Sequence, residues 1–289
     1  MKNQITGHTR LTALLGSPVA HSISPMMHNE AFKLLGLDYA YLAFDVDLKH
    51  LKNAVEGLKT LNCRGFNCTM PHKTLVCEYV DHLSEAAKLI GAVNTIVNED
   101  GILTGHNTDG VGYMQSVKAA GYDIINKNMT LLGAGGAASS ICAQAALDGV
   151  SEIYVFNRKG PTFTKAQTLI DAINANTSCK VHLYDLEDQT MLKNCLDRSD
   201  ILTNGTSIGM APNTEASPLK DTSLFHENLI VSDVIYNPEE TKLMKDAKLA
   251  GCHTFNGLYM LLYQGAEAFR IWTGQEMPIE PIKKKFFDR

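Results

Sequence analysis

The sequence has no excess of positive charge and no long apolar run. Lys and Arg number 26 against 31 Asp and Glu, a formal net charge of −5, which argues against a nucleic-acid binder that relies on a basic surface. No apolar stretch approaches the roughly 20 residues of a membrane-spanning helix. The apolar run 11–16 is too short for the core of a signal peptide. We therefore expect a cytoplasmic protein with neither nucleic-acid nor membrane partners.

Cysteine is present but never in a paired spacing. No two of the seven cysteines are separated by only two residues, which excludes the common zinc and redox motifs. Their odd number argues against a closed disulfide framework. In a reducing compartment they are expected to act as small buried hydrophobes, and no metal site is expected.

What the sequence does contain is a repeated alternation of strand-like and helix-like segments. After Asp109 this alternation takes the regular β-α-β form of a doubly wound parallel sheet. Before it, a strand pair is expected to turn at Glu99-Asp100-Gly101. We predict two α/β domains, 1–109 and 110–256, with residues 257–289 packing back on the first.

A glycine-rich turn opens the second domain. Residues 131–138 read LLGAGGAA and match Gly-x-Gly-x-x-Ala. Gly133 would allow the tight turn, Gly135 the close approach of a pyrophosphate, and Ala138 the packing of the helix on the sheet. Such a turn can also bind nothing, but the strand before it and the helix of small residues after it favour a dinucleotide site.

The next strand ends in basic residues. An acid at this point would hold the ribose hydroxyls of NAD, whereas the sequence has Asn157-Arg158-Lys159. A guanidinium suits the 2′-phosphate of NADP, because it pairs with phosphate through two hydrogen bonds. Arg158 could instead stack on the adenine, or the segment could be a solvated basic loop.

Polar residues gather at the expected strand ends of the first domain. Ser22 and Ser24 precede a helix and can donate to a carboxylate, although Ser24 also suits an N-cap before Pro25 at the first helical position. Two further motifs, GAVNT (91–95) and GHNTDG (105–110), add polar groups, and Asp109 is a natural N-cap.

The heptapeptide NCTMPHK (67–73) is the densest of these segments. Asn67 and Thr69 alternate along a strand, so one face can present both side chains. Pro71 is expected to start a helix, which would place Lys73 in its first turn, where the helix dipole disfavours a cation. A functional lysine can accept that cost because repulsion and burial lower its pKa; the alternative is a surface lysine. His72 is expected to be structural.

Taken together, these segments resemble the shikimate dehydrogenase family, including its quinate/shikimate branch. The resemblance covers the whole chain through nine ordered motifs: GSPVAHSISPMMHN, GFNCTMPHK, GAVNT, GHNTDG, GAGGAA, FNR, NGTSIGM, DVIYNP and NGLYMLLYQGA. It implies an N-terminal substrate domain and a Rossmann-type NAD(P) domain with a cleft between them. It also implies reversible reduction of 3-dehydroshikimate to shikimate on the way to chorismate and the aromatic amino acids, with quinate as a further substrate of some members.

The same resemblance assigns residues to roles. Lys73 and Asp109 would be the catalytic pair. The substrate residues would be Ser22, Ser24, Asn67, Thr69, Lys73, Asn94, Asp109, Tyr236 and Gln264, the two serines holding the carboxylate. The cofactor residues would be Gly133, Ala134, Gly135, Gly136, Ala137, Asn157, Arg158, Lys159, Asn204, Thr206 and Gly257.

Two departures from the family pattern concern the cofactor. Lys159 stands where many NADP-dependent members have Thr, and Gly160 stands about where the quinate/shikimate branch often has an acid. The expected cofactor is therefore NAD or NADP. The paired serines, without a Thr at the second, fit shikimate better than a quinate specialist.

Two other functions stay open on the sequence. One is an oxidoreductase acting on another polyol or on a folate; the other is a non-catalytic protein that senses NAD(P). The Lys73–Asp109 pair argues against a sensor, which has no need of proton transfer. The sequence does not decide between a monomer and a homodimer.

Overall fold

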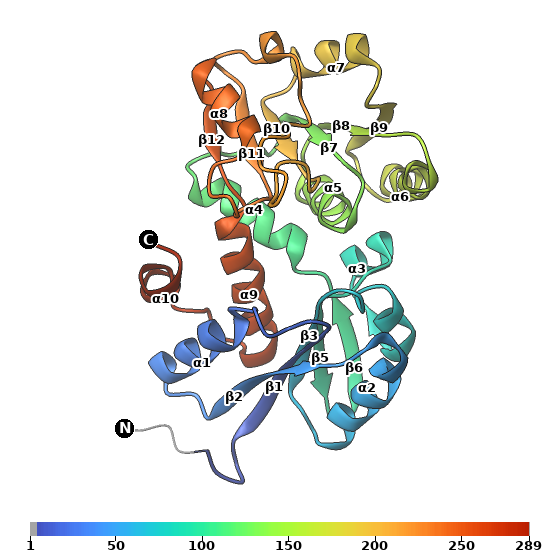
Figure 1. Cartoon of the computed structure of the whole chain (residues 1–289). Coiled ribbons are helices and arrows are strands. Elements are labelled where there is room, and N and C mark those ends of the chain that lie inside the picture. The colour runs from blue at the N-terminus through green and yellow to red at the C-terminus, as the bar shows by residue number, and fades with distance from the viewer. Residues whose placement is uncertain (1–4, 289) are drawn as a thin grey trace. The chain divides into compact units, whose positions relative to one another are not determined.

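The computed structural model describes residues 5–288 and divides into two compact units (Figure 1). Unit 1 takes the described residues up to Thr108 and those from Leu262 on, and unit 2 is Asp109–Leu261. Each unit has its own six-stranded sheet flanked by helices. The predicted class, two α/β domains with a doubly wound second domain, is confirmed.

The sheet of unit 1 is mixed, with strand order β2-β1-β3-β5-β6-β4. Its parallel pairs are β1–β2, β1–β3 and β4–β6, while β5 runs antiparallel to β3 and β6. The hairpin β5–β6 turns at Asp100 (φ 53°) and Gly101 (φ 89°), the left-handed conformations that such a tight turn needs. The strands are β1 (Arg10–Gly16), β2 (Tyr39–Asp45), β3 (Gly65–Cys68), β4 (His82–Leu83), β5 (Thr95–Glu99) and β6 (Ile102–His106).

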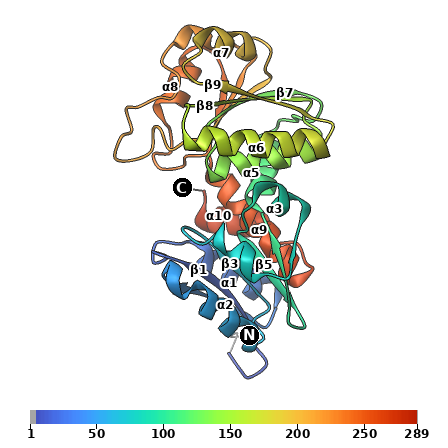
Figure 2. The same cartoon turned by 90° about the vertical axis from the view of Figure 1, so that its right-hand side faces the viewer.

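Helices cover both faces of this sheet (Figures 1 and 2). Helix α2 packs on the face that carries Leu15 and Phe66. On the other face, the α1 residue His28 stacks on Tyr41 with ring centroids 4.6 Å apart, and Trp272 of α9 donates its indole N–H to the Ile96 carbonyl at 2.9 Å. The helices are α1 (Ser24–Leu35), α2 (Leu51–Thr60), α3 (Glu85–Ile90), α9 (Leu258–Thr273) and α10 (Ile279–Phe286), with 3-10 turns at Leu48–His50 and Leu75–Tyr79.

Two local predictions in unit 1 were wrong. No α-helix begins at Pro71: Lys73 lies in a turn that is followed by the 3-10 helix Leu75–Tyr79. The amide of His72 turns back to the Thr69 carbonyl (2.9 Å), and such tight turns replace a regular α-helical ladder. The argument that a helix dipole repels Lys73 therefore does not apply.

The second wrong prediction concerns the start of α1. Ser24 is the first residue of the helix rather than its N-cap, and Ile23 occupies the N-cap position without a capping side chain. Ile23 already has helical dihedral angles (φ −80°, ψ −15°), and the Ser24 amide donates instead to the Ser22 hydroxyl at 3.2 Å. The two serines thus form one local turn.

The sheet of unit 2 is wholly parallel, with strand order β12-β11-β10-β7-β8-β9. The order reverses between β10 and β7, and ligands of doubly wound sheets bind outside the carboxyl ends of the strands at such a point. The strands are β7 (Asn128–Leu132), β8 (Glu152–Asn157), β9 (Lys180–Asp185), β10 (Ile201–Asn204), β11 (Ile230–Asp233) and β12 (His253–Phe255). The helices are α4 (Asp109–Ala119), α5 (Gly136–Asp148), α6 (Pro161–Asn176), α7 (Gln189–Leu196) and α8 (Lys242–Leu249), with a 3-10 turn at Thr222–Leu224.

The helices between residues 5 and 288 include none that is both long and apolar enough to cross a membrane.

Candidate active site

Buried Asn94 joins three of the polar segments of unit 1. Its carbonyl accepts the Cys68 amide at 2.9 Å, which ties it to the end of β3. Its side-chain oxygen accepts the Thr108 amide at 2.8 Å, which ties it to the segment after β6. The neighbouring Val93 amide donates to the Lys73 carbonyl at 2.8 Å. The motifs NCTMPHK, GAVNT and GHNTDG therefore form one hydrogen-bonded cluster, and Asp109 belongs to the last of them, directly after Thr108.

Asn67 is buried in the same cluster and its amide is fully used. Its Nδ2 donates to the Asn94 carbonyl (3.0 Å) and to the Thr95 hydroxyl (2.9 Å), and its Oδ1 accepts from the Tyr41 hydroxyl at 2.7 Å. Both amide protons are thus committed to protein partners. Asn67 therefore holds other groups in place rather than offering a proton to a ligand.

Tyr41 is a residue of this cluster that sequence analysis missed. Its ring is wholly buried, and its hydroxyl also hydrogen-bonds Ser24. Burial raises the pKa of this phenol well above its ordinary value, so the group stays a donor. The Tyr41 hydroxyl thereby connects a predicted carboxylate-binding serine with Asn67. Only the aromatic character of β2 was visible in the sequence.

His72 holds the turn that carries Lys73. The imidazole is buried and its Nε2 lies 2.7 Å from the Val46 carbonyl, just after β2. A carbonyl only accepts, so this nitrogen carries the proton. This contact fits the expected structural role of His72, which stays a prediction. Lys73 itself is half-buried beside it.

The remaining predicted substrate residues lie in both units. Thr69 follows β3 in unit 1, is partly exposed, and donates its amide to the Leu15 carbonyl at 2.9 Å. Gln264 lies in the part of α9 that belongs to unit 1 and is half-buried. Tyr236 follows β11 in unit 2 and is 48% exposed.

The glycine-rich turn has the geometry of a phosphate cradle. Gly133 has φ +99°, and its amide donates to the Phe156 carbonyl at 2.7 Å. Gly135 is the N-cap of α5, and Cβ atoms built on Gly135 and Gly136 would meet nothing within 4 Å. Ala138 is buried where α5 meets Gly205 of the β10 segment. Open space above glycine at a helix N-terminus fits a bound pyrophosphate.

The segment after β8 carries the predicted ribose-end residues. Asn157 donates its side-chain amide to the Thr162 hydroxyl at 3.0 Å, which closes the loop into α6. Arg158 is exposed, and Lys159 pairs with Asp185 at 3.4 Å. Gly160 has φ +145°, a conformation that residues with a side chain rarely adopt.

A buried carboxylate organises the loops after β10 and β11. The Asp233 oxygens accept from Asn204 Nδ2 (3.1 Å), from the Thr241 hydroxyl (2.8 Å) and from the Ile235 amide (3.0 Å). Burial nevertheless raises the pKa of Asp233 to about 6. Asn204 also accepts the Thr206 hydroxyl at 2.7 Å. The buried Asn204 therefore fixes Thr206 beside the glycine turn, where Thr206 lies close to Gly133.

Gly257 closes the same edge of unit 2. Its amide donates to the Ile235 carbonyl at 3.1 Å, and a Cβ there would lie 2.0 Å from the Val234 carbonyl oxygen. Only glycine allows the backbone at position 257 to pack so closely against Val234.

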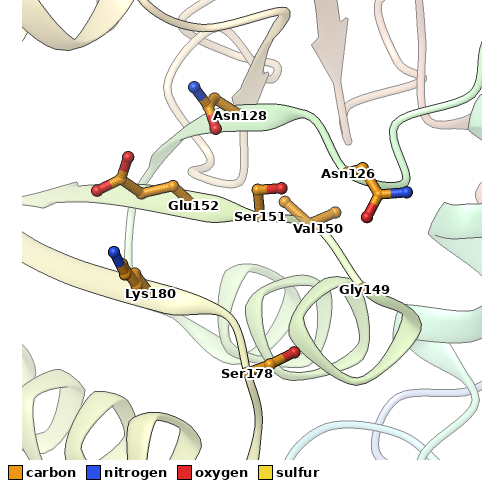
Figure 3. Close-up of a pocket in the computed structure, with 8 residues that line it drawn as sticks. All are labelled: Asn126, Asn128, Gly149, Val150, Ser151, Glu152, Ser178 and Lys180. Atoms are coloured by element: carbon orange, nitrogen blue, oxygen red, sulfur yellow. The ribbon is translucent and has the colours of Figure 1, made fainter.

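A surface pocket of about 310 Å³ lies at the other end of the unit 2 strands (Figure 3). It surrounds the first residues of β7, β8 and β9, whereas nucleotides bind at the carboxyl ends of such strands. The Glu152 carboxylate in its wall is already bound by the Tyr154 hydroxyl (2.7 Å) and by His182 (2.8 Å). The lining residues are Asn126, Asn128, Gly149, Val150, Ser151, Glu152, Ser178 and Lys180. This pocket is not the predicted dinucleotide site.

Within the described part of the chain, no three His, Cys, Asp or Glu side chains gather in a group that could hold a metal ion.

The doubly wound unit has a glycine-rich turn at its switch point, and the second α/β unit has a lysine among polar groups at its strand ends. Together these features fit the class of nicotinamide-dependent oxidoreductases. Comparison with known proteins gives the family. The shikimate dehydrogenase substrate binding domain matches residues 14–96, and the shikimate 5′-dehydrogenase C-terminal domain matches residues 257–285. The chain belongs to the shikimate dehydrogenase family.

Full-length relatives agree with this assignment. A shikimate dehydrogenase (NADP(+)) of Listeria monocytogenes is 53% identical over 284 residues, 98% of each chain. A quinate/shikimate dehydrogenase of Escherichia coli is 48% identical over 280 residues, 97% of each. The crystal structure of a Listeria monocytogenes shikimate 5-dehydrogenase with shikimate and NAD has a TM-score of 0.96 at 52% identity, covering 99% of both chains.

Proposed function

We propose that this protein catalyses the reversible, NAD- or NADP-dependent reduction of 3-dehydroshikimate to shikimate. Its membership of the shikimate dehydrogenase family and relatives at 53% and 48% identity over nearly the whole chain support this reaction. Because one of those relatives is a quinate/shikimate dehydrogenase, quinate is a second substrate to test. Residues 1–109 with 257–289 would form the substrate-binding domain, and residues 110–256 the cofactor-binding domain.

Lys73 is the proposed proton carrier. When NAD or NADP is bound, its nicotinamide supplies or accepts the hydride. The oxygen on the reacting carbon must gain or lose a proton in step, and Lys73 gives that proton as ammonium or takes it as amine. Asp109 would hold the lysine ammonium and a ring hydroxyl of the substrate. No metal is required for this exchange.

The other polar groups would hold and orient the substrate. Ser22 and Ser24 would donate to its carboxylate, with Tyr236 near it. Thr69, Asn94 and Gln264 would hold the ring hydroxyls. Asn67 would act indirectly, since its amide protons are used by Asn94 and Thr95.

One observation supports this proposal above the others: the backbone on either side of Lys73 is fixed. The Lys73 carbonyl accepts the Val93 amide at 2.8 Å, and the preceding residue, His72, is anchored to the Val46 carbonyl at 2.7 Å. Fixed backbone restricts where an acid-base side chain can reach, and positioning of that kind is what proton transfer in a site requires.

The test is a matrix of initial rates with shikimate and quinate, each with NAD and NADP, followed by nicotinamide absorbance. Lys73→Ala should lower kcat by about 100- to 10,000-fold, the usual contribution of general acid-base catalysis, with an unchanged circular dichroism spectrum. The control is Lys88→Ala, which removes an exposed lysine of α3. Near-normal turnover by Lys73→Ala would exclude its catalytic role. Cofactor binding without turnover of either substrate would favour a sensor.

We further propose that the protein works in the cytoplasm as a monomer or a homodimer. Size-exclusion chromatography with light scattering distinguishes the two states.

A further inference from the structure

The basic loop after β8 has an acidic neighbour, Asp185, at the end of β9. The acid that NAD-binding folds usually carry at the end of the β8 strand itself is absent from this sequence. Asp185 is the last residue of β9, and it pairs in register with Asn157, the last residue of β8. The two strands are neighbours in the sheet of unit 2 (Figure 1). The side chain of Asp185 is only 23% exposed, and its Oδ2 lies 3.4 Å from the ammonium of Lys159. Two neighbouring strands thus bring an acid to the basic loop.

The position of this acid is fixed by the backbone. Its Oδ1 accepts the Glu187 amide at 3.1 Å, and the Leu186 amide donates to the Asn157 carbonyl at 3.0 Å. Lys159, in contrast, has a side chain that is 77% exposed. Asp185 is therefore the rigid partner of the pair, and it determines where Lys159 rests.

The loop consequently offers less positive charge than its sequence shows. Arg158 is exposed and has no acidic partner among the described residues, whereas Lys159 is paired with Asp185. Gly160, at φ +145°, contributes no side chain. The 2′-phosphate of NADP carries a charge of about −2, and only one of the two cations is unshared when it arrives. NAD has only a hydroxyl at this position, so the pairing of Lys159 with Asp185 does not weaken its binding.

We propose that Asp185 determines cofactor selectivity by holding Lys159 away from the 2′-phosphate, so that the site accepts NAD alongside NADP. Asp185 is a positioning residue: it acts through Lys159 and needs no contact with the nucleotide. This inference rests on the proposed function, because it assumes that the loop after β8 receives the ribose end of NAD(P).

The test is calorimetric titration of NAD and NADP into the full-length protein without substrate, which separates binding from turnover. Asp185→Asn keeps the shape of the side chain and frees Lys159. It should tighten NADP binding about two- to fivefold, since an exposed ion pair contributes up to about 1 kcal/mol, and change NAD binding by a smaller factor. The gain should shrink as salt is raised, because exposed charges are screened. The NADP/NAD ratio of kcat/KM should move in the same direction.

A double-mutant cycle checks the route through Lys159. In the Lys159→Ala background, Asp185→Asn should no longer improve NADP binding. The matched control is Asp197→Asn, which breaks the surface pair Lys193–Asp197 (3.1 Å) at the far end of α7 and should leave both nucleotides unchanged.

The outcomes separate this inference from the proposed function. An unchanged NADP/NAD ratio in Asp185→Asn, or a gain that persists in full without Lys159, would overturn the role of Asp185. Failure of the wild-type protein to bind either nucleotide would overturn the cofactor site and this inference with it. Binding of both nucleotides without turnover of shikimate would overturn the proposed reaction alone.

Discussion

The glycine-rich turn gives the sharpest test of the cofactor site, because two of its glycines are needed for different reasons. Gly133 has φ +99°, and a Cβ there would lie 2.7 Å from the Thr206 methyl. Gly135 has φ −78° and ψ −175°, which any residue adopts, and a Cβ there would meet nothing within 4 Å. Gly133 is thus required by the fold, whereas Gly135 is required only by a ligand that approaches it.

The magnitudes follow from these surroundings. Gly133→Ala should lower the free energy of unfolding by about 2–4 kcal/mol, since left-handed strain costs about 1–2 kcal/mol and the close methyl contact adds a packing penalty of about 1–2 kcal/mol. For Gly135→Ala, the loss of unfolded-state entropy stabilises by about 0.4–1 kcal/mol. The poorer N-cap costs a similar amount. The net change in stability of Gly135→Ala should be within about 0.5 kcal/mol of zero.

Gly135→Ala, which leaves stability nearly unchanged, should be the substitution that specifically weakens cofactor binding. The methyl of Gly135→Ala occupies the space that a pyrophosphate needs, so the Kd of NAD and NADP should rise at least about tenfold, or about 1.4 kcal/mol. Urea unfolding measures the stability and calorimetry the binding. Wild-type affinity in Gly135→Ala would refute the phosphate cradle, and a wild-type urea midpoint in Gly133→Ala would refute the strain argument.

Three further predictions concern buried polar groups. The pKa of Asp233 is raised to about 6 in the folded protein, so its contribution to stability falls as pH rises from about 4 to 6, by at most about 3 kcal/mol. In urea titrations, Asp233→Asn should therefore gain stability relative to wild type across that window. A stability difference that does not vary with pH would contradict this. Tyr41→Phe leaves the Asn67 oxygen without its 2.7 Å donor, so we expect a loss of about 1–3 kcal/mol and a higher KM for shikimate with the KM for cofactor unchanged; an unchanged KM for shikimate would exclude a positioning role. His72→Leu removes the hydrogen bond to the Val46 carbonyl and should cost about 1–3 kcal/mol in urea unfolding, whereas wild-type stability would show that the bond contributes nothing.

The parts of the fold that could be predicted are those in which local signals agree. In unit 2, apolar strands, a positive-φ glycine and a helix of small residues all occur within one short segment, and each supports the same β-α-β structure. The hairpin at Asp100-Gly101 was likewise predicted from its turn residues. Such features depend on neighbours in the sequence, so a single sequence contains them.

The failure at Pro71 has the opposite cause. A proline is compatible with the start of a helix, and nothing local distinguishes an α-helix from a turn followed by five residues of 3-10 helix. The structure near Pro71 depends on a distant partner: the Val93 amide donates a hydrogen bond to the Lys73 carbonyl. The failure at Ser24 is local instead: the Ser24 amide donates to the hydroxyl of Ser22, only two residues earlier, and Ser24 is itself the first residue of the helix.

Tyr41 was missed for the same reason as the turn at Pro71, because its partner is distant in the sequence, and its position shows what the strand-end polar residues do. Its hydroxyl bonds Asn67, which is 26 residues away in the chain, and Asn67 in turn bonds Thr95, a further 28 residues on. Each side chain taken alone is an ordinary strand or turn residue. Once linked, they are buried groups whose bonding capacity is committed to one another, and a buried network of this kind is stable only when its members are satisfied together. In the proposed function, Thr69 and Lys73 would present the surface that contacts the substrate, and Asn67 and Tyr41 would hold that surface in place from behind.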